Sequence, residues 1–287
     1  MAESPLKLKI ALGKHAHVQP LKDGRVTSDR LDLTFVEYDP LPKAFRNFVR
    51  TDELDVSEMA LTTHLLALEA GQDISALPIP LWRRLHHDNL VCKAGSDLKG
   101  PKDLEGRRVG VRAYSQTTGV WIRGILAREY GVDLSKITFV TMEDAHVPGF
   151  VDPANCVRND TSKSLRDMLL DGNLAAIMGE RTVDPSDVRP VIEDPKAADA
   201  WSERTGIFPV NHVVSVRAHL LKAHPWLAGE LMTLFDEARL ASGGDGVAAM
   251  PYGLEPTREA MQMLLDFAHE QGLTRERRLV DDVFPSF

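Results

Sequence analysis

Residues 107–132 read RRVGVRAYSQTTGVWIRGILAREYGV, and this pattern predicts a strand, a turn and a helix in that order. The first seven residues are short and valine-containing, whereas residues 117–132 place apolar side chains at helical spacing before a stop at Gly131. Free backbone N–H groups at a helix start, with hydroxyls beside them, suit a carboxylate. We therefore expect a small anion to bind the turn, although an ordinary helix N-cap is the alternative. The turn residues are Tyr114, Ser115, Gln116, Thr117 and Thr118.

Strands and helices are predicted to alternate along most of the chain. Such alternation is typical of an α/β protein with mostly parallel sheets and helices on their faces. Ligands bind such sheets beyond the carboxyl ends of the strands, where helix N-termini gather. The expected strands are 6–13, 31–39, the short segment 52–56, 74–81, 89–95, 107–113, 136–143, 174–179 and 212–217; the expected helices are 43–51, 57–70, 117–132, 162–173 and most of 218–271.

The number of strands and the long helical tail favour two lobes with a ligand cleft between them. We expect the chain to cross between the lobes near residues 92–96 and 208–213. The first lobe would then comprise 1–92 with 213–287, its C-terminal helices packing back on it, and the second lobe would comprise 93–212.

Composition limits the classes of partner. The chain has 287 residues, a formal net charge of −8 and a pI near 5.7, which argues against nucleic acid as the main partner. A local pocket can still attract a small anion. No stretch approaches the roughly 20 apolar residues of a membrane span, and residues 1–15 lack an apolar core of secretory length. With Cys92 and Cys156 expected as free thiols, we predict a cytoplasmic protein, and its size favours a homo-oligomer.

Histidines follow several predicted strand ends and are the candidates for acid–base chemistry. His15 follows the first strand, His86 and His87 precede a buried strand near one crossover, and His212 lies at the other. Adjacent strand residues point to opposite faces, so we expect only one of His86 and His87 to enter the cleft. For His212, a hinge hydrogen bond to the backbone is the alternative. Three converging histidines would match the ligands of a divalent metal, but no HxxxH spacing supports one, so a metal is not favoured.

Further polar and aromatic residues are candidates for ligand binding. Trp121 lies one turn into the helix and is expected to face an aromatic ring, and Arg181 follows a strand end, where it would pair with a carboxylate or with Glu180. Glu58 is expected in the first turn of a helix, where it complements the helix dipole, and a cleft role for it is less favoured. The sequence does not decide whether the side chain of Arg112 points into the cleft or away from it. The remaining candidates are Arg84, His146 and Asn211.

Several stretches, in the right order and spanning most of the chain, resemble the 4,5-dihydroxyphthalate decarboxylases and their relatives with the type 2 periplasmic-binding-protein fold. The most specific are RAYSQTTGVWIRGIL (112–126) and PVNHVV (209–214); the others include PLKDGRVTSDRLDLTF (20–35), ELDVSEMALTTHLLA (53–67), HHDNLV (86–91) and MLLDGNLAAIMG (168–179). The resemblance implies that fold, in which the same turn binds anions.

The same resemblance implies a carboxy-lyase without a cofactor, converting 4,5-dihydroxyphthalate to protocatechuate by histidine acid–base chemistry. Because the family lies close to solute-binding proteins, a non-catalytic receptor for an aromatic or carboxylate solute is the alternative. The sequence departs from the family pattern at CKAGSDLKG (92–100) and GERTVDP (179–185), near the expected cleft. Another hydroxylated aromatic acid is therefore also a candidate substrate.

Overall fold

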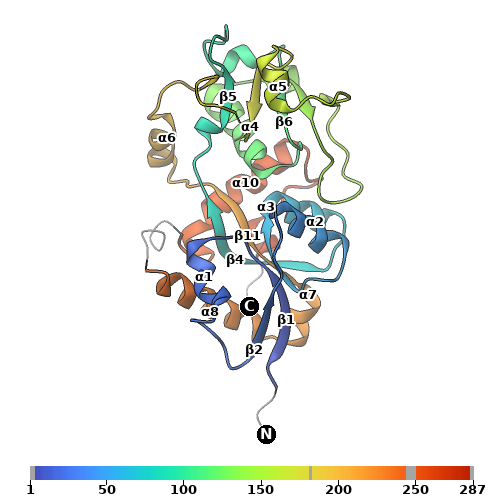
Figure 1. Ribbon diagram of the computed structural model, residues 1–287, viewed down its shortest axis with the longest axis vertical. Coiled ribbons are helices and arrows are strands. Elements are labelled where there is room, and N and C mark those ends of the chain that lie inside the picture. The colour runs from blue at the N-terminus through green and yellow to red at the C-terminus, as the bar shows by residue number, and fades with distance from the viewer. Residues whose placement is uncertain (1–3, 181–182, 244–249, 285–287) are drawn as a thin grey trace.

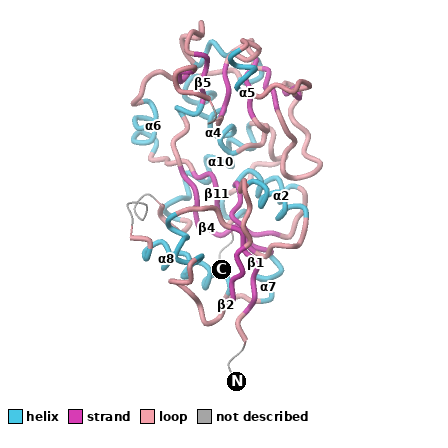
Figure 2. The backbone as a smooth tube through the Cα atoms, viewed as in Figure 1, coloured by secondary structure: helices cyan, strands magenta, loops and turns pink. Residues whose placement is uncertain are grey.

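The computed structural model describes residues 4–180, 183–243 and 250–284. The protein has two lobes, each built around one sheet, with helices outside the strands (Figures 1 and 2). The sheet of the first lobe has the strand order β2-β1-β3-β11-β4, and that of the second lobe has the order β10-β5-β9-β6-β7-β8.

The first lobe takes its strands from both ends of the chain. The strands are β1 (Leu6–Ala11), β2 (Leu31–Phe35), β3 (Val56–Ala60), β4 (Ile74–Arg83) and β11 (Val210–Arg217). The helices are α1 (Gln19–Lys22), α2 (Pro42–Arg50), α3 (Leu61–Glu69), α7 (Ala218–Ala223) and α8 (Leu227–Ala241). Helix α8 packs against α1 and β4, so this part of the helical tail covers the first sheet.

The second lobe is formed by the middle of the chain. Its strands are β5 (Leu90–Lys93), β6 (Arg108–Val111), β7 (Thr138–Thr141), β8 (Cys156–Arg158), β9 (Ala176–Met178) and β10 (Val188–Pro190). Its helices are α4 (Thr117–Tyr130), α5 (Leu165–Leu170) and α6 (Ala197–Thr205). The strand, turn and helix expected within 107–132 are therefore confirmed, and Gly131 ends α4 in the left-handed conformation at φ 63°.

Both sheets are mixed rather than mostly parallel. Strand β11 runs antiparallel to β3 and β4, and β5 runs antiparallel to β9 and β10, whereas the other pairs are parallel. Each of these two strands is the first that the chain forms after passing from one sheet to the other. It therefore enters its sheet from the end at which the parallel strands leave, and it runs against them.

The chain passes between the sheets at residues 84–89 and 206–209. The first passage lies before the expected crossover at 92–96, and the second overlaps the start of the expected crossover at 208–213. Strand β5 already pairs in the second sheet, and all of β11 pairs in the first. Helix α10 (Arg258–Glu270) contacts α4 as well as β11, and it lies between the two sheets (Figure 1). The C-terminal helices thus touch both lobes.

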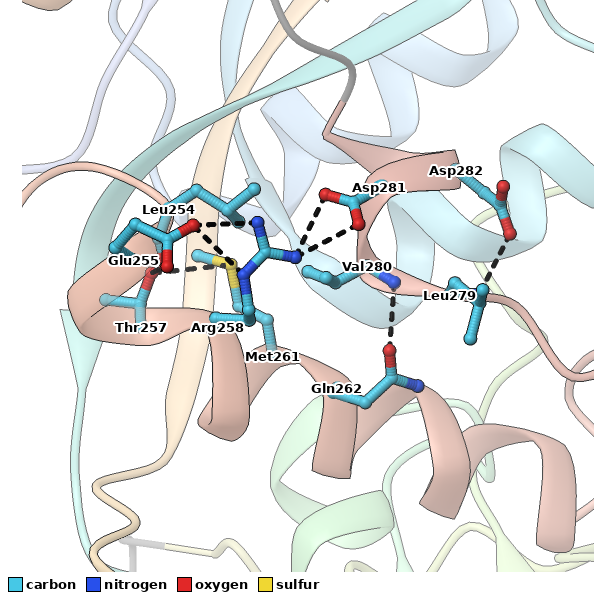
Figure 3. A network of polar contacts seen from close by, with 10 residues as sticks. All are labelled: Leu254, Glu255, Thr257, Arg258, Met261, Gln262, Leu279, Val280, Asp281 and Asp282. Atoms are coloured by element: carbon cyan, nitrogen blue, oxygen red, sulfur yellow. Dashed lines mark hydrogen bonds and ion pairs between the residues drawn. The ribbon is translucent and has the colours of Figure 1, made fainter.

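Close packing of α10 on α4 requires a glycine. A Cβ at Gly124 would lie 2.1 Å from the ring of Phe267, and the same ring meets Trp121 edge-on at 5.6 Å between centroids. The short helix α11 (Val280–Val283) is fastened to α10, because Val280 N–H donates to Gln262 and Asp281 pairs with Arg258 (Figure 3). These contacts fix the end of the chain beside the junction of the lobes.

Two local expectations are wrong. The helix expected over 57–70 begins only at Leu61, because β3 continues to Ala60 and all five of its residues are buried. Glu58 is therefore a strand residue and not a first-turn helix residue. The three-residue strands β8 and β10 were not expected, since so short a segment carries no readable period. None of the described helices is long and apolar enough to cross a bilayer.

Candidate functional site

A cavity of about 610 Å³ lies where the two lobes meet. Residues of both lobes form its wall, mainly from segments that follow the carboxyl ends of strands, as expected for this class of sheet. The lining residues are His15, Pro40, Leu41, Pro42, Phe45, Ala60, Thr62, Thr63, Trp82, Arg84, Arg112, Ala113, Ser115, Gln116, Thr117, Thr118, His146, Gly179, Asn211 and His212.

Two helix N-termini open into this cavity. Helix α4 begins after Gln116 and helix α3 after Ala60; both residues have extended backbones, and neither side chain caps its helix. The hydroxyl of Thr62 on α3 donates to the carbonyl of Ser115 at 2.7 Å and lies 2.7 Å from the hydroxyl of Thr117 on α4. The positive ends of two helix dipoles therefore face one space, which favours a bound anion.

Two arginines add positive charge to the wall. Arg84 donates from Nη2 to the hydroxyl of Thr118 at 2.9 Å, and its guanidinium stacks over the ring of Trp82 at 4.7 Å. Asn211 donates to the same hydroxyl at 3.4 Å. Arg112 enters the wall from the second lobe, directly after β6. A guanidinium fork matches a carboxylate, so the cavity suits a ligand with more than one acidic group.

A buried carboxylate holds two histidines on the first-lobe wall. Glu58 on β3 is fully buried, and it accepts hydrogen bonds from the Gly13 amide at 2.8 Å, from His15 Nε2 at 2.9 Å and from His212 Nδ1 at 2.6 Å. Burial alone would raise the pKa of Glu58, but the hydrogen bonds and charges of His15 and His212 outweigh it and lower that pKa. Glu58 is therefore an anion across the physiological range.

The orientation of His212 follows from these contacts. Its Nδ1 is directed at Glu58, so Nε2 is the ring nitrogen left for a ligand, and within the described part of the chain no residue hydrogen-bonds it. The rings of Phe45 and Trp82 meet the imidazole edge-on, at 5.1 and 4.8 Å between centroids. A carboxylate that orients an imidazole, with the opposite nitrogen facing a cavity, is the arrangement used for general acid–base catalysis.

The loop after β7 closes the cavity from the second lobe. Glu143 in this loop pairs with Arg112 of its own lobe at 3.0 Å and with Arg46 of α2 at 2.5 Å. Arg50, also on α2, donates to the carbonyl of His146 at 3.0 Å. The loop is therefore fastened to the first lobe at two points, and His146 in this loop lines the cavity.

His146 is a neutral hydrogen-bonding group. Its Nδ1 lies 3.1 Å from the hydroxyl of Thr63, and its ring packs beside Phe45. Burial, followed by the charges of Arg112, Arg46 and Arg50, lowers the pKa of His146 to about 3. A neutral imidazole in this position can exchange a hydrogen bond with a ligand hydroxyl.

Comparison with known proteins identifies the family. Residues 29–157 match the family described as NMT1/THI5 like. A 4,5-dihydroxyphthalate decarboxylase of Comamonas testosteroni is 30% identical over 304 aligned residues, which cover 97% of this chain and 90% of that relative. The chain belongs to the 4,5-dihydroxyphthalate decarboxylase family. A decarboxylase of the same name from Pseudomonas putida is 30% identical over 184 residues, 61% of this chain and 71% of the relative.

Solved structures share the fold of this family member. The alkanesulfonate-binding protein SsuA of Xanthomonas axonopodis pv. citri, bound to MOPS, superposes with a TM-score of 0.58 at 18% identity over 99% of both chains. The aliphatic sulphonate binding protein SsuA of Escherichia coli gives 0.61 at 15% identity over 98% of both. The two-lobed, periplasmic-binding-protein-like fold expected from the sequence is confirmed.

Most of the candidate residues of this family member line the cavity, and two aromatic ones do not. The cavity brings together His15, Arg84, Ser115, Gln116, Thr117, Thr118, His146, Asn211 and His212. Trp121 on α4 is fully buried and its Nε1 donates to the carbonyl of Val210 at 3.0 Å, so its ring cannot face a ligand. The hydroxyl of Tyr114 donates to the carbonyl of Gln271 at 3.2 Å, away from the cavity. Arg181 lies outside the described residues.

The expectation that His86 or His87 enters the cleft is wrong. Residues 84–86 are irregular and His87–Asn89 form a 3-10 helix instead of a strand, so the alternation of faces does not apply to them. His86 is fully buried, donates to Asn211 Oδ1 at 3.1 Å and stacks on Trp121. His87 packs against Trp201. Both histidines belong to the passage between the lobes and not to the cavity wall.

The central residue of the site, Glu58, was not expected there. Its signal in the sequence is a carboxylate within the apolar run DVSEMALTT, which a buried strand tolerates only when the charge has partners. Those partners, His15 and His212, lie 43 and 154 residues away in the sequence. Within residues 4–180, 183–243 and 250–284, no group of three or more histidine, cysteine or acidic side chains has the geometry to hold a metal ion.

Proposed function

We propose that this protein decarboxylates a hydroxylated aromatic dicarboxylate, foremost 4,5-dihydroxyphthalate, and releases protocatechuate and carbon dioxide. The observation that carries the proposal is the buried Glu58 carboxylate with His15 and His212 on one wall of a cation-lined cavity. Membership of a family whose relatives are named for this activity supports it.

The carboxylate that stays on the ring is proposed to bind at the start of α4. The backbone N–H groups of the first turn, the hydroxyl of Thr118 and the guanidinium of Arg84 converge there. This carboxylate acts as a handle that fixes the position of the ring. A monocarboxylate product has lost either the handle or the leaving group, and it therefore does not react again.

The carboxylate that leaves is proposed to lie against the Glu58–His212 pair. A proton moves from His212 Nε2 to the ring carbon that bears this carboxylate, the carbon–carbon bond then breaks, and its electron pair returns to the ring as carbon dioxide departs. Glu58 stabilises the protonated imidazole before this transfer, and a proton from water restores it afterwards. The apolar neighbours Phe45 and Trp82 favour loss of the charged group as a neutral gas.

The ring hydroxyl para to the leaving carboxylate supplies the electron density for protonation of the ring. We propose that His146, neutral at pH 7 and hydrogen-bonded to Thr63, accepts the hydrogen bond of that hydroxyl. Arg112 in the same wall would stabilise negative charge that develops on the oxygen. The proposed reaction transfers one proton and no electrons, so it requires no redox cofactor.

A non-catalytic receptor for an aromatic or carboxylate solute is the second candidate, because the fold is also that of sulfonate-binding proteins. Incubation with 4,5-dihydroxyphthalate, with and without a chelator, separates the two. The decarboxylase should release equal amounts of carbon dioxide and protocatechuate in both reactions. Thermal stabilisation by the dicarboxylate without any product would instead support the receptor. The cytoplasmic location and the homo-oligomer expected from the sequence remain proposals, which cell fractionation and light scattering test.

A further inference from the structure

A fully buried arginine lies directly behind the carboxylate-binding turn. Arg123 on α4 donates from Nη2 to the carbonyl of Tyr114 at 2.6 Å, and its guanidinium stacks on the Tyr114 ring at 3.9 Å. A Cβ at Gly119 would lie 3.0 Å from Arg123 Nη1. The guanidinium therefore touches the backbone at the beginning of the turn and in the first turn of α4, from the side opposite the cavity.

The charge of Arg123 has no ion-pair partner. No carboxylate of the described residues lies within ion-pairing distance, and Nη1 lacks a hydrogen-bond partner among them. Asp152 and the thiol of Cys156 act on it only at longer range, and burial lowers the pKa of Arg123. An arginine nevertheless keeps its proton in proteins. A buried, uncompensated cation is unfavourable unless something opposes its charge, and a bound anion would do so.

A neutral amide occupies the place where a carboxylate would be expected. Gln271, at the end of α10, accepts from Arg123 Nε at 2.7 Å and donates to the carbonyl of Val120 at 2.9 Å. Its backbone carbonyl accepts from the hydroxyl of Tyr114. A glutamate here would pair with the guanidinium and cancel its field, whereas glutamine orients the guanidinium and leaves its charge in force.

We propose that Arg123 is a positioning residue whose unneutralised charge, held in place by Gln271, strengthens binding of the ligand carboxylate at the α4 turn. The inference rests on the carboxylate site of the proposed function, but it does not depend on turnover. The contact between α10 and the second lobe would then contribute to ligand affinity.

Gln271→Glu and Gln271→Met form a matched pair for the test. Both variants lose the amide that donates to Val120, and they differ in whether a negative charge faces Arg123. Titration calorimetry with phthalate, which lacks the hydroxyls needed for reaction, measures binding alone. We expect the dissociation constant of Gln271→Glu to exceed that of Gln271→Met about tenfold, because the new carboxylate opposes the field of Arg123 at the turn.

Equal weakening in both variants, or none in either, would overturn the proposal, as would a wild-type protein that fails to bind phthalate. If Gln271→Glu does not fold, Arg123→Lys and Arg123→Met provide the same comparison, and the lysine variant should bind phthalate more tightly because it keeps the cation. A wild-type protein that binds phthalate but releases no carbon dioxide from 4,5-dihydroxyphthalate would refute the decarboxylase and leave this inference standing.

Discussion

Replacement of Glu58 by glutamine is the most direct test of the proposed catalytic role of Glu58 and His212. The substitution keeps the size of the side chain but removes its charge, and it presents an amide N–H₂ where only acceptors now lie. Glu58 accepts from three donors: the Gly13 amide, His15 and His212. Glutamine has one oxygen for these donors, so at least one donor must face the amide nitrogen.

The magnitude follows from these contacts. Hydrogen bonds to charged groups contribute about 1.5–3 kcal/mol each, so loss of one or two should lower the free energy of unfolding by about 2–4 kcal/mol. Without the carboxylate, His212 loses the charge that stabilises its protonated form during proton transfer. Because general acid–base catalysis is worth about 10²–10⁴ in rate, we expect kcat to fall by that range, with a much smaller change in KM.

The assay measures carbon dioxide release at saturating 4,5-dihydroxyphthalate, beside urea unfolding of the same samples. Glu58→Asp is the matched control, because it keeps the charge on a shorter side chain. Its kcat should lie between those of the wild type and Glu58→Gln. The pH dependence has a definite sign. Since the folded-state pKa of Glu58 is lowered, its carboxylate stabilises the wild type above the ordinary value of 4.5, and this contribution shrinks as the pH falls below it. A glutamine variant with wild-type kcat would refute the assignment.

Three further predictions test other parts of the molecule. His212→Gln should lower kcat at least about a hundredfold, whereas His87→Leu, which changes a buried histidine outside the cavity, should leave kcat and KM within about twofold; steady-state kinetics decides. Thr118→Val removes the hydroxyl that accepts from Arg84 and Asn211 and should raise KM about tenfold with little change in kcat, and unchanged KM would exclude the turn as the handle. Burial lowers the pKa of His64 to about 3 from 6.5, so the unfolded chain binds the proton first and stability falls as pH drops below 6.5. His64→Gln should therefore reduce the stability lost between pH 7 and pH 5 by about 2 kcal/mol in urea unfolding.

The strand, turn and helix at 107–132 were predictable because each has a strong local cause. Valines favour the strand, the glycine at 131 ends the helix in a left-handed conformation, and the polar turn leaves helix N–H groups open. The direction of β5 and β11 was not predictable in the same way. A short buried run has the same composition in a parallel or an antiparallel pair, and direction depends on how the chain passes between the lobes.

In the candidate site, too, the features with a local cause could be predicted and those that depend on the fold could not. The polar turn before α4 is local, and its place in the cavity wall could be predicted, whereas the contacts of Glu58 depend on histidines that the fold brings from β11 and from the end of β1. Locally, a glutamate before an apolar helical pattern is indistinguishable from a first-turn helix charge. His86 and His87 show the converse. Their sequence was rich in functional residue types, but the passage at 84–89 buries them away from the cavity.

The energetic cost of Glu58 bears on the choice between enzyme and receptor. Two helix N-termini and two arginines favour an anionic ligand, and this feature alone would serve a receptor as well as an enzyme. A receptor would gain nothing from a fully buried carboxylate, whose desolvation costs several kcal/mol and whose negative charge opposes an anionic ligand. Its partners are two histidines, the side chains best suited to carry a proton near neutral pH. Glu58 therefore lowers the affinity for an anionic ligand, but it prepares His212 to donate a proton. This combination favours the decarboxylase over the receptor.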